Sequence, residues 1–320
     1  MRIGIPAPNI SRPSGKVAIT EIARLAEQLD FDSLWLGDHV VWPSGQKYQR
    51  LGETPETAKY SGDLFDPFVT AGYLAGITER IKIGFGVIVV PYRNPVIAAK
   101  MLASLDQLSE GRILVGVGPG YMSGEFKALG VPRKRTGEQV DDFIEFLSLI
   151  AETDQPAFSG RTFDFESAFF RPQPKQASLP IWIGGVSAAA MQRALRWGNA
   201  WQLPGMSISQ IRRPLAEFRT LAELQRRPMD DFTISARLRI RFASQPVSHE
   251  HKHAEDRIYD EASPHLEGPP RYLADQLARY STELNIDHLV ISVHEGDSLV
   301  GVLAAIERFG AEVLPHLSQI

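Results

Sequence analysis

"RIKIGFGVIVVPYRNPVIAAKMLASLDQLSEGRILVGVG", residues 80–118, contains two apolar segments separated by a longer amphipathic one. The segments at 80–90 and 112–118 are largely apolar and rich in β-branched residues, which is typical of strands buried on both faces of a parallel sheet. From Pro95 onward, apolar residues recur at three- and four-residue spacing and so share one face of a helix. They are Ile97, Met101, Leu102, Leu105 and Leu108. The stretch is therefore predicted to fold as a strand–helix–strand unit.

The same alternation extends over the whole chain. Strands are predicted at 2–6, 32–37, 80–90, 112–118, 180–185, 199–204, 232–243 and 287–293. Helices are predicted at 16–29, from 66, from 95, and at 137–152, 187–197, 208–225, 271–284 and 299–317. Eight strands alternating with eight helices predict an α/β fold, a (β/α)8 TIM barrel in which residues 1–320 form a single domain.

Residues 154–179 interrupt the alternation between the fourth helix and the fifth strand, where "TFDFESAFF" predicts an inserted hairpin. An open, doubly wound sheet is the alternative fold. It is less favoured because eight units exceed the usual number of about five or six, and because the first strand–helix turn has no G-x-G-x-x-G motif.

The composition favours a small-molecule partner. The chain has 34 basic and 38 acidic residues, and its net charge of -4 leaves no basic face for nucleic acid or for a membrane surface. The absence of cysteine excludes disulfides, thiolate metal ligands and a cysteine nucleophile. No segment has the apolar run of a signal peptide or the roughly 18 apolar residues of a membrane span. We therefore expect a soluble, cytoplasmic protein.

The second predicted strand ends in two titratable residues, Asp38 and His39, within "SLWLGDHVVWP". In a TIM barrel the carboxyl end of each strand faces the active-site mouth, so the pair is placed for chemistry. The structural alternative is that Asp38 caps a turn and His39 is only a polar residue with satisfied hydrogen bonds.

Other predicted strand ends carry glycine and aromatic residues. Gly86 lies within the third strand and indicates a bulge or a close approach by a ligand, although packing is an alternative reason. A glycine-rich loop after the fourth strand, which includes Gly118, brings Tyr121 to the mouth. The sixth and eighth strands contribute Trp201, Gln202, His294 and Glu295. Aromatic surroundings with few charges favour a planar cofactor over a sugar or a metal.

The fifth strand leads into a candidate anion site. Gly184 and Gly185 expose backbone amides, and Ser187 can cap the helix that follows, so that its positive end points at the pocket. This arrangement suits a phosphate. An ordinary strand–helix turn with a good N-cap is the alternative interpretation.

Two other kinds of enzyme are less favoured by the sequence. His249, His251 and His253 alternate in "SHEHKHAED" and could bind a transition metal, as in a metal-dependent hydrolase, but they lie in a charged segment beyond the seventh strand, and a solvated loop is favoured. A Schiff-base aldolase needs a lysine at a strand end, and none is predicted there.

Several motifs in order resemble the luciferase-like monooxygenase superfamily, especially its branch that uses the deazaflavin coenzyme F420. They are "SLWLGDH", the stretch from Glu79 to Gly120, "EF" at 125–126, "LPIWIGGVS" and "GNAWQLP", and the resemblance extends to "GPPRYLADQL" and "IDHLVIS" near the end of the chain. The resemblance implies a (β/α)8 barrel that binds F420 or FMN at the strand carboxyl ends, and a homodimer.

The resemblance also implies residue roles. Asp38 and His39 would lie beside the deazaflavin ring, the peptide between Gly86 and Val87 would be cis and back the ring, and the segment from Gly184 through Val186 to Ser187 would hold the cofactor phosphate. A glutamate that donates a proton in the sugar-phosphate dehydrogenases of this branch is replaced here by Tyr121, so a sugar phosphate is not implied as the substrate.

The sequence therefore predicts an F420-dependent oxidoreductase that transfers a hydride between the deazaflavin and a small organic substrate. His39 is expected to transfer the proton and Asp38 to orient it or to bond the ring edge, with Tyr121 and His294 contacting the substrate. Arg193 is expected near the anionic cofactor tail. The alternative is an FMN-dependent monooxygenase that uses reduced flavin and O2 with a separate reductase, and a barrel that binds flavin without catalysis is a further possibility.

Overall fold

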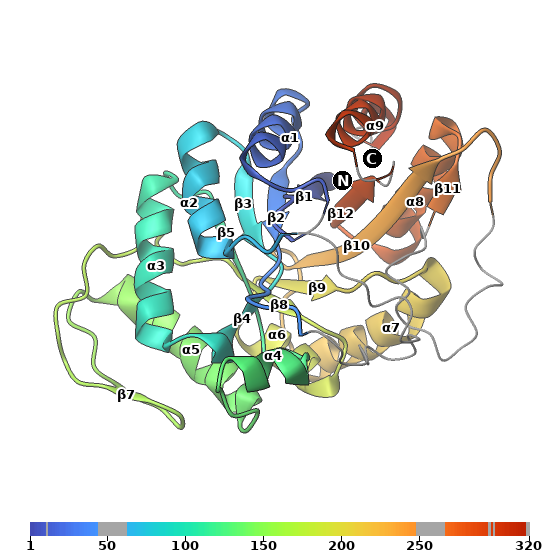
Figure 1. Ribbon diagram of the computed structural model, residues 1–320. Coiled ribbons are helices and arrows are strands. Elements are labelled where there is room, and N and C mark those ends of the chain that lie inside the picture. Colours follow the sequence, from blue (N-terminus) through green and yellow to red (C-terminus); the bar gives the residue numbers. More distant parts are fainter. Residues whose placement is uncertain (11, 44–62, 248–265, 294–295, 297, 318–320) are drawn as a thin grey trace.

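The computed structural model describes residues 1–10, 12–43, 63–247, 266–293, 296 and 298–317, and their strands close into a parallel barrel (Figure 1). The sheet order is β1, β2, β3, β5, β8, β9, β10 and β12, and β12 pairs with β1 to close the ring. These strands are β1 (Arg2–Pro6), β2 (Ser33–Leu36), β3 (Lys82–Phe85), β5 (Ile113–Gly118), β8 (Ile181–Gly184), β9 (Ala200–Leu203), β10 (Thr233–Phe242) and β12 (His288–Val293). The predicted (β/α)8 TIM barrel is confirmed, and the open sheet is excluded.

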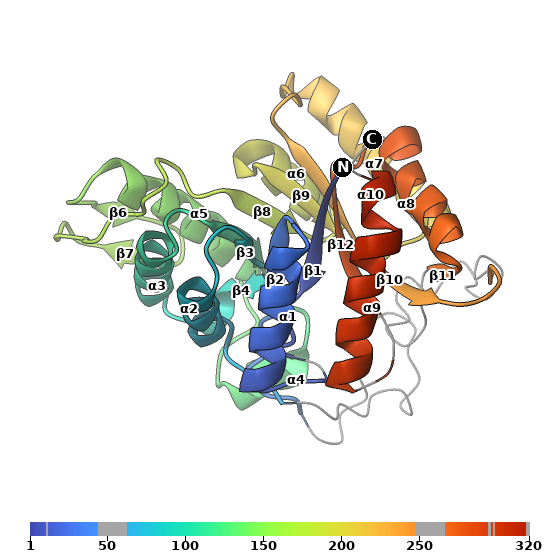
Figure 2. The same cartoon turned by 90° about the horizontal axis from the view of Figure 1, so that it is seen from above.

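Helices cover the outside of the barrel, each after its strand. They are α1 (Lys16–Gln28), α2 (Pro67–Ile77), α3 (Pro95–Leu108), α5 (Thr136–Glu152), α6 (Ala188–Trp197), α7 (Ile208–Leu224), α8 (Pro270–Leu284) and α9 (Leu299–Glu312), followed by a short α10 (Leu314–Leu317). Helix α9 packs beside α1, so the two ends of the barrel sequence meet (Figures 1 and 2). Asp66 and Asn94 cap α2 and α3 with their side chains, and a proline follows each cap, as the sequence predicted for α2.

The structure adds four short elements to this plan. The predicted strand 80–90 is divided into β3 and β4 (Ile88–Val89), followed by the 3-10 turn η1 (Val90–Tyr92). The division falls at Gly86–Val87, whose peptide is cis as predicted. A helix that the periodicity did not predict, α4 (Ser123–Ala128), follows β5, and a short strand β11 (Leu266–Gly268) pairs in parallel with the carboxyl end of β10.

The inserted hairpin is confirmed as β6 (Phe158–Ser159) paired antiparallel with β7 (Asp164–Phe165). It projects away from the barrel in both views (Figures 1 and 2). Its phenylalanines pack back on Phe146 of α5, with ring centroids 5.3 to 5.7 Å apart, so the insertion is anchored on the outer face of a barrel helix.

Two apolar layers stabilise the barrel. The larger lies between the strands and the helices, and the smaller fills the lumen with Trp35, Leu114, Trp182, Ala200 and Val290. Below this floor, His288 is fully buried and hydrogen-bonds to Ser33 and Ser235 at 3.0 and 2.9 Å. Burial lowers the pKa of His288. Among the described residues, buried side chains therefore fill the amino-terminal part of the lumen, and the partly exposed lumen residues lie toward the carboxyl ends of the strands.

Gly116 of β5 supplies a prediction about packing in the lumen. A Cβ on this residue would lie 1.9 Å from the carbonyl oxygen of Phe85, which is backbone and cannot turn away. Gly116→Ala is therefore expected to lower the free energy of unfolding by about 1–3 kcal/mol, measured by urea denaturation. The control is Gly76→Ala, because Gly76 is an exposed position of α2 with open space around it, and it is expected to gain up to about 1 kcal/mol. Equal effects of the two substitutions would contradict the packing argument.

Candidate active site

The candidate site lies at the carboxyl ends of the strands, where residues that follow β2, β4 and β5 converge. Asp38 and His39 follow β2, and Glu125 belongs to α4, which lies at the end of the barrel opposite the N-terminus (Figure 2). Tyr92 and Arg93 come from the turn after β4. This is the end of a TIM barrel where catalytic groups are found.

His39 and Glu125 form a hydrogen-bonded pair. Nδ1 of His39 lies 2.9 Å from Oε2 of Glu125, and the side chains are 13% and 0% exposed. Glu125 also accepts hydrogen bonds from the hydroxyl of Tyr92 at 2.8 Å and from the backbone N–H of Val40 at 2.6 Å and of Val41 at 3.3 Å. The carboxylate therefore fixes the orientation of the imidazole and the backbone that follows it.

The surroundings of Glu125 keep it ionised. Burial acts to raise the pKa of this carboxyl, but the hydrogen bond and charge of His39, with the further bonds from Tyr92 and Val40, outweigh burial and place the pKa below its ordinary value. The same buried carboxylate raises the pKa of Tyr92, together with burial of the phenol, so Tyr92 remains a neutral donor. Glu125 therefore accepts a hydrogen bond from the imidazole of His39 and does not itself exchange protons near neutral pH.

The other face of the imidazole meets aromatic residues. Nε2 of His39 lies 3.4 Å from the hydroxyl of Tyr121, which sequence analysis had placed at the mouth. The rings of Trp42 and Tyr121 approach the imidazole edge-on, with centroids 5.4 and 5.9 Å away. Since Glu125 takes Nδ1, Nε2 is the ring nitrogen that the carboxylate leaves for another partner.

Asp38 is bonded to an arginine. Its two carboxylate oxygens accept hydrogen bonds from Nη1 and Nη2 of Arg93 at 2.6 and 2.8 Å, and one also accepts the N–H of Val89 at 2.9 Å. Burial opposes the charge of Arg93, but the hydrogen bonds and charge of Asp38 outweigh it and raise the pKa of Arg93. Arg93 also reaches Asp66, the cap of α2, at 3.1 Å. The residue that orients His39 is thus Glu125, and Asp38 links β2 to β4.

The Gly86–Val87 bulge lies among glycines of neighbouring strands. A Cβ on Gly118 or on Gly184 would lie 2.8 or 2.7 Å from a methyl carbon of Val87. These two glycines, predicted to bind the cofactor, therefore also make room for the side chain of Val87. Gly86 and Val87 are themselves partly exposed, so the bulge forms part of the open end of the lumen.

The loop between β8 and α6 suits a phosphate. Gly185 has a φ of 106°, and a Cβ there would meet only Ala190 at 3.6 Å, so the backbone is open to a ligand. Ser187 caps α6 by accepting the N–H of Ala190 at 3.2 Å, and residues 187–189 are exposed. The amides and the positive helix end together fit an anionic group of a cofactor. The expectation for Arg193 is wrong, because its guanidinium is buried and bonds to Asp141 at 2.5 Å and to the carbonyl of Gly137.

Some predicted residues lie outside the described part of the chain: His294, Glu295 and the cluster of His249, His251 and His253. Among the described residues, no group of three or more histidine, cysteine, aspartate or glutamate side chains is arranged to hold a metal ion. No helix within the same residues is long and apolar enough to cross a bilayer.

Sequence analysis did not identify Glu125 and Tyr92 as site residues. Both were present in motifs that carried the family resemblance, but neither lies directly at a strand end, where candidates were sought. The one available signal for Glu125 was its position before Phe126, soon after a strand. This signal is weak, because acidic residues occupy many helix positions of the same kind.

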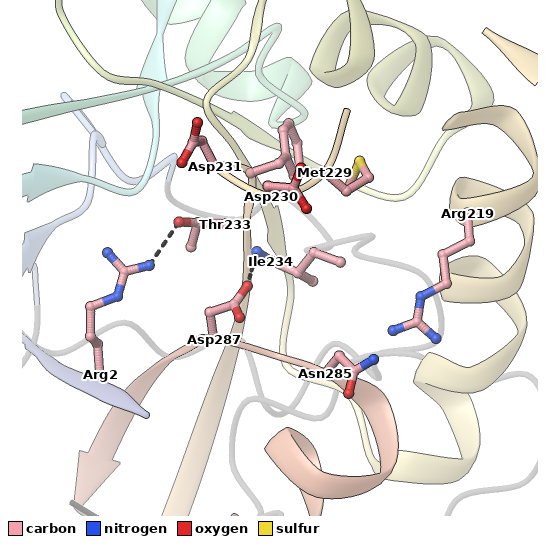
Figure 3. Close-up of a pocket in the computed structure, with 10 residues that line it drawn as sticks. Arg2, Arg219, Met229, Asp230, Asp231, Thr233, Ile234, Asn285 and Asp287 are labelled. Atoms are coloured by element: carbon pink, nitrogen blue, oxygen red, sulfur yellow. Dashed lines mark hydrogen bonds between the residues drawn. The ribbon is translucent and has the colours of Figure 1, made fainter. Parts of the chain in front are cut away.

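A separate hollow of about 590 Å³ lies at the amino-terminal end of the barrel (Figure 3). Arg2 hydrogen-bonds there to Thr233, and Asp287 accepts the N–H of Ile234. This hollow is on the far side of the apolar floor from His39 and Glu125, at the end of a TIM barrel that is associated with stability. It is therefore not the candidate active site.

The fold and the site define a (β/α)8-barrel enzyme with a histidine–glutamate pair at its mouth and a glycine turn before α6. Comparison with known proteins is consistent with this class. The pattern of the luciferase-like monooxygenase family matches residues 3–301, so the chain belongs to that family and is an oxidoreductase.

Three similar proteins illustrate the range of the family. The FMNH2-dependent dimethylsulfone monooxygenase of Pseudomonas putida is 33% identical over 221 residues, which are 67% of this chain and 59% of that protein. An uncharacterised protein of Mycobacterium tuberculosis is 28% identical over 204 residues, which are 63% of this chain and 70% of that protein. The structure of the coenzyme F420-dependent tetrahydromethanopterin reductase of Methanopyrus kandleri superposes with a TM-score of 0.75 at 17% identity, covering 99% of both chains. That structural similarity supports the fold alone.

Proposed function

We propose that the protein is a coenzyme F420-dependent oxidoreductase that acts on a small organic substrate. The observation that carries the proposal is the pair formed by His39 and Glu125, with Nδ1 held at 2.9 Å and Nε2 facing the mouth. Hydride transfer between an alcohol and a carbonyl moves one proton at oxygen for each hydride, and a histidine oriented by a carboxylate suits that transfer.

Residues on three sides of the mouth fit the cofactor. The loop from Gly184 to Ser187 would hold its phosphate through the amides that follow Gly185 and the amino end of α6, since the N–H of Gly185 itself donates to the carbonyl of Gln202 at 3.3 Å. The bulge at Gly86 and Val87, with Gly118 beside it, would lie against its ring. When bound, the deazaflavin supplies the carbon that accepts or gives the hydride.

The protein side chains have distinct roles in this proposal. His39 exchanges a proton with the substrate oxygen through Nε2, and Glu125 holds the tautomer and orientation through Nδ1. Tyr121, at 3.4 Å from Nε2, contacts the substrate beside it. Asp38 is a positioning residue that acts through Arg93. His294 remains a predicted substrate contact, and a homodimer remains the expected assembly.

An FMN-dependent monooxygenase is the second candidate, favoured by the relative from Pseudomonas putida. It would use the same mouth for O2 and for reduced flavin, and a separate reductase would supply the reduced flavin. A barrel that only binds flavin is less favoured, because such a protein has no need for a buried glutamate that orients a histidine at the mouth.

Titration of the apo protein with F420 and with FMN tests the choice of cofactor. F420 is expected to bind at least about tenfold more tightly, because its tail adds negative charge that the exposed amides before α6 can meet. Fluorescence of each cofactor measures both dissociation constants on one preparation. Equal affinities, or tighter binding of FMN, would contradict the proposal and favour the monooxygenase.

A further inference from the structure

Strand β10 directs alternate side chains into the lumen. Even-numbered residues such as Ala236, Leu238 and Ile240 are buried against the helices, so odd-numbered residues face inward. Ser235 confirms this direction, because its hydroxyl bonds to the buried His288 at 2.9 Å. The next inward residues toward the carboxyl end are arginines.

Arg237 lies directly beside the bulge at the mouth. A Cβ on Gly86 would be 2.8 Å from Nη2 of Arg237 and 3.2 Å from Oε1 of Gln202. Arg237 is partly exposed, whereas Gln202 is 4% exposed. A guanidinium and an amide side chain therefore meet next to Gly86, just above the apolar floor of the lumen.

Arg239 extends this group by one layer toward the open end. It faces inward like Arg237, is partly exposed, and pairs in register with Ser292 of β12. Both arginines also interact with other groups of the chain. A guanidinium has five N–H donors in a planar fork, a geometry that matches two oxygens of an anion.

The amide of Gln202 supplies a second observation. Within the described residues, Nε2 of this buried side chain has no hydrogen-bond acceptor. A buried N–H group without an acceptor costs free energy, and a ligand oxygen at this position would remove that cost. The carboxylates of Asp38 and Glu125 are bonded to Arg93 and His39, so neither supplies this acceptor.

We propose that Arg237, Arg239 and Gln202 form a site for a carboxylate, sulfonate or phosphate group carried by the substrate. This inference rests on the proposed function, which supplies the reaction. It adds the class of substrate, which is an organic anion whose charged group binds beside Gly86. Neutral substrates of the same shape would bind less tightly, because the guanidinium groups would gain no charge-assisted hydrogen bonds.

The test uses small probes and the apo protein. Benzoate and benzenesulfonate are titrated by calorimetry against neutral benzamide, and the anions are expected to bind at least about tenfold more tightly. Arg239→Gln is expected to remove this preference, and Arg239→Lys to keep most of it. The matched control is Arg241→Gln, on the same strand but bonded to Glu267 at 2.7 and 2.9 Å, which is expected to leave the preference unchanged.

Three results would overturn the proposal. One is equal binding of benzoate and benzamide by the wild type, which needs no variant and so does not depend on folding of a substituted protein. Another is that Arg239→Gln and Arg241→Gln reduce the preference for the anions over benzamide to the same extent. The third is that saturating F420 or FMN displaces benzoate and that Arg239→Gln binds the cofactor more weakly. Together these two observations would assign the arginines to an anionic group of the cofactor. Because the probes are measured without turnover, a failure to bind F420 would contradict only the proposed function.

Discussion

His39→Ala is expected to lower kcat by roughly 100-fold or more while leaving the dissociation constant of the cofactor nearly unchanged. The reason is that in the proposed function Nε2 of His39 exchanges the substrate proton, whereas the bulge and the loop before α6 would hold the cofactor. The measurement is single-turnover reduction of the cofactor with a substrate found by screening, together with a binding titration on the same preparation. Added imidazole is expected to restore part of the rate.

The structural alternative for His39 has a different result. If the imidazole only packs against Trp42 and Tyr121, the substitution would lower Tm, and the folded fraction would turn over at the wild-type rate. Glu125→Gln separates positioning from folding, because glutamine keeps the shape of the side chain and its one oxygen can still accept from either Tyr92 or Val40, which bond to different oxygens of the carboxylate. It is expected to lower kcat less than His39→Ala and to displace the pH profile of kcat. A profile identical to that of the wild type would contradict the positioning role of Glu125.

Asp38→Ala is expected to lower the free energy of unfolding by about 3–5 kcal/mol, because it leaves the buried guanidinium of Arg93 without its bidentate partner. The side chains of Asp38 and Arg93 are 0% and 14% exposed, so water replaces the lost carboxylate poorly. Urea denaturation at neutral pH measures the change. The control is Glu138→Ala, which removes an exposed partner of Arg135 and is expected to change stability by less than about 1 kcal/mol.

A double substitution tests the coupling. Asp38→Ala combined with Arg93→Met removes both charges, so it is expected to be less destabilising than the sum of the two single changes. Strict additivity would mean that the two residues do not act as a pair. It would also return Asp38 to a direct role at the cofactor ring, as the sequence interpretation proposed.

The barrel was predictable because its signals are local. Apolar runs such as 112–118 and the helix face from Pro95 repeat with periods that the backbone geometry sets, so their order along the chain indicates the fold. The break at Gly86 was also visible, since a glycine within a strand is unusual. The helix α4 was not, because six residues are too few to show a helical period.

By itself, the sequence determined the alternation of strands and helices, and it placed Asp38, His39 and the Gly184–Ser187 loop at one end of the barrel. Only the tertiary structure decided which groups meet there. It paired His39 with Glu125, 86 positions later, joined Asp38 to Arg93, and brought Arg237 beside Gly86. Closure of the barrel brings distant strand ends together, and burial then requires each polar group to find a partner in three dimensions, which no spacing along the chain specifies.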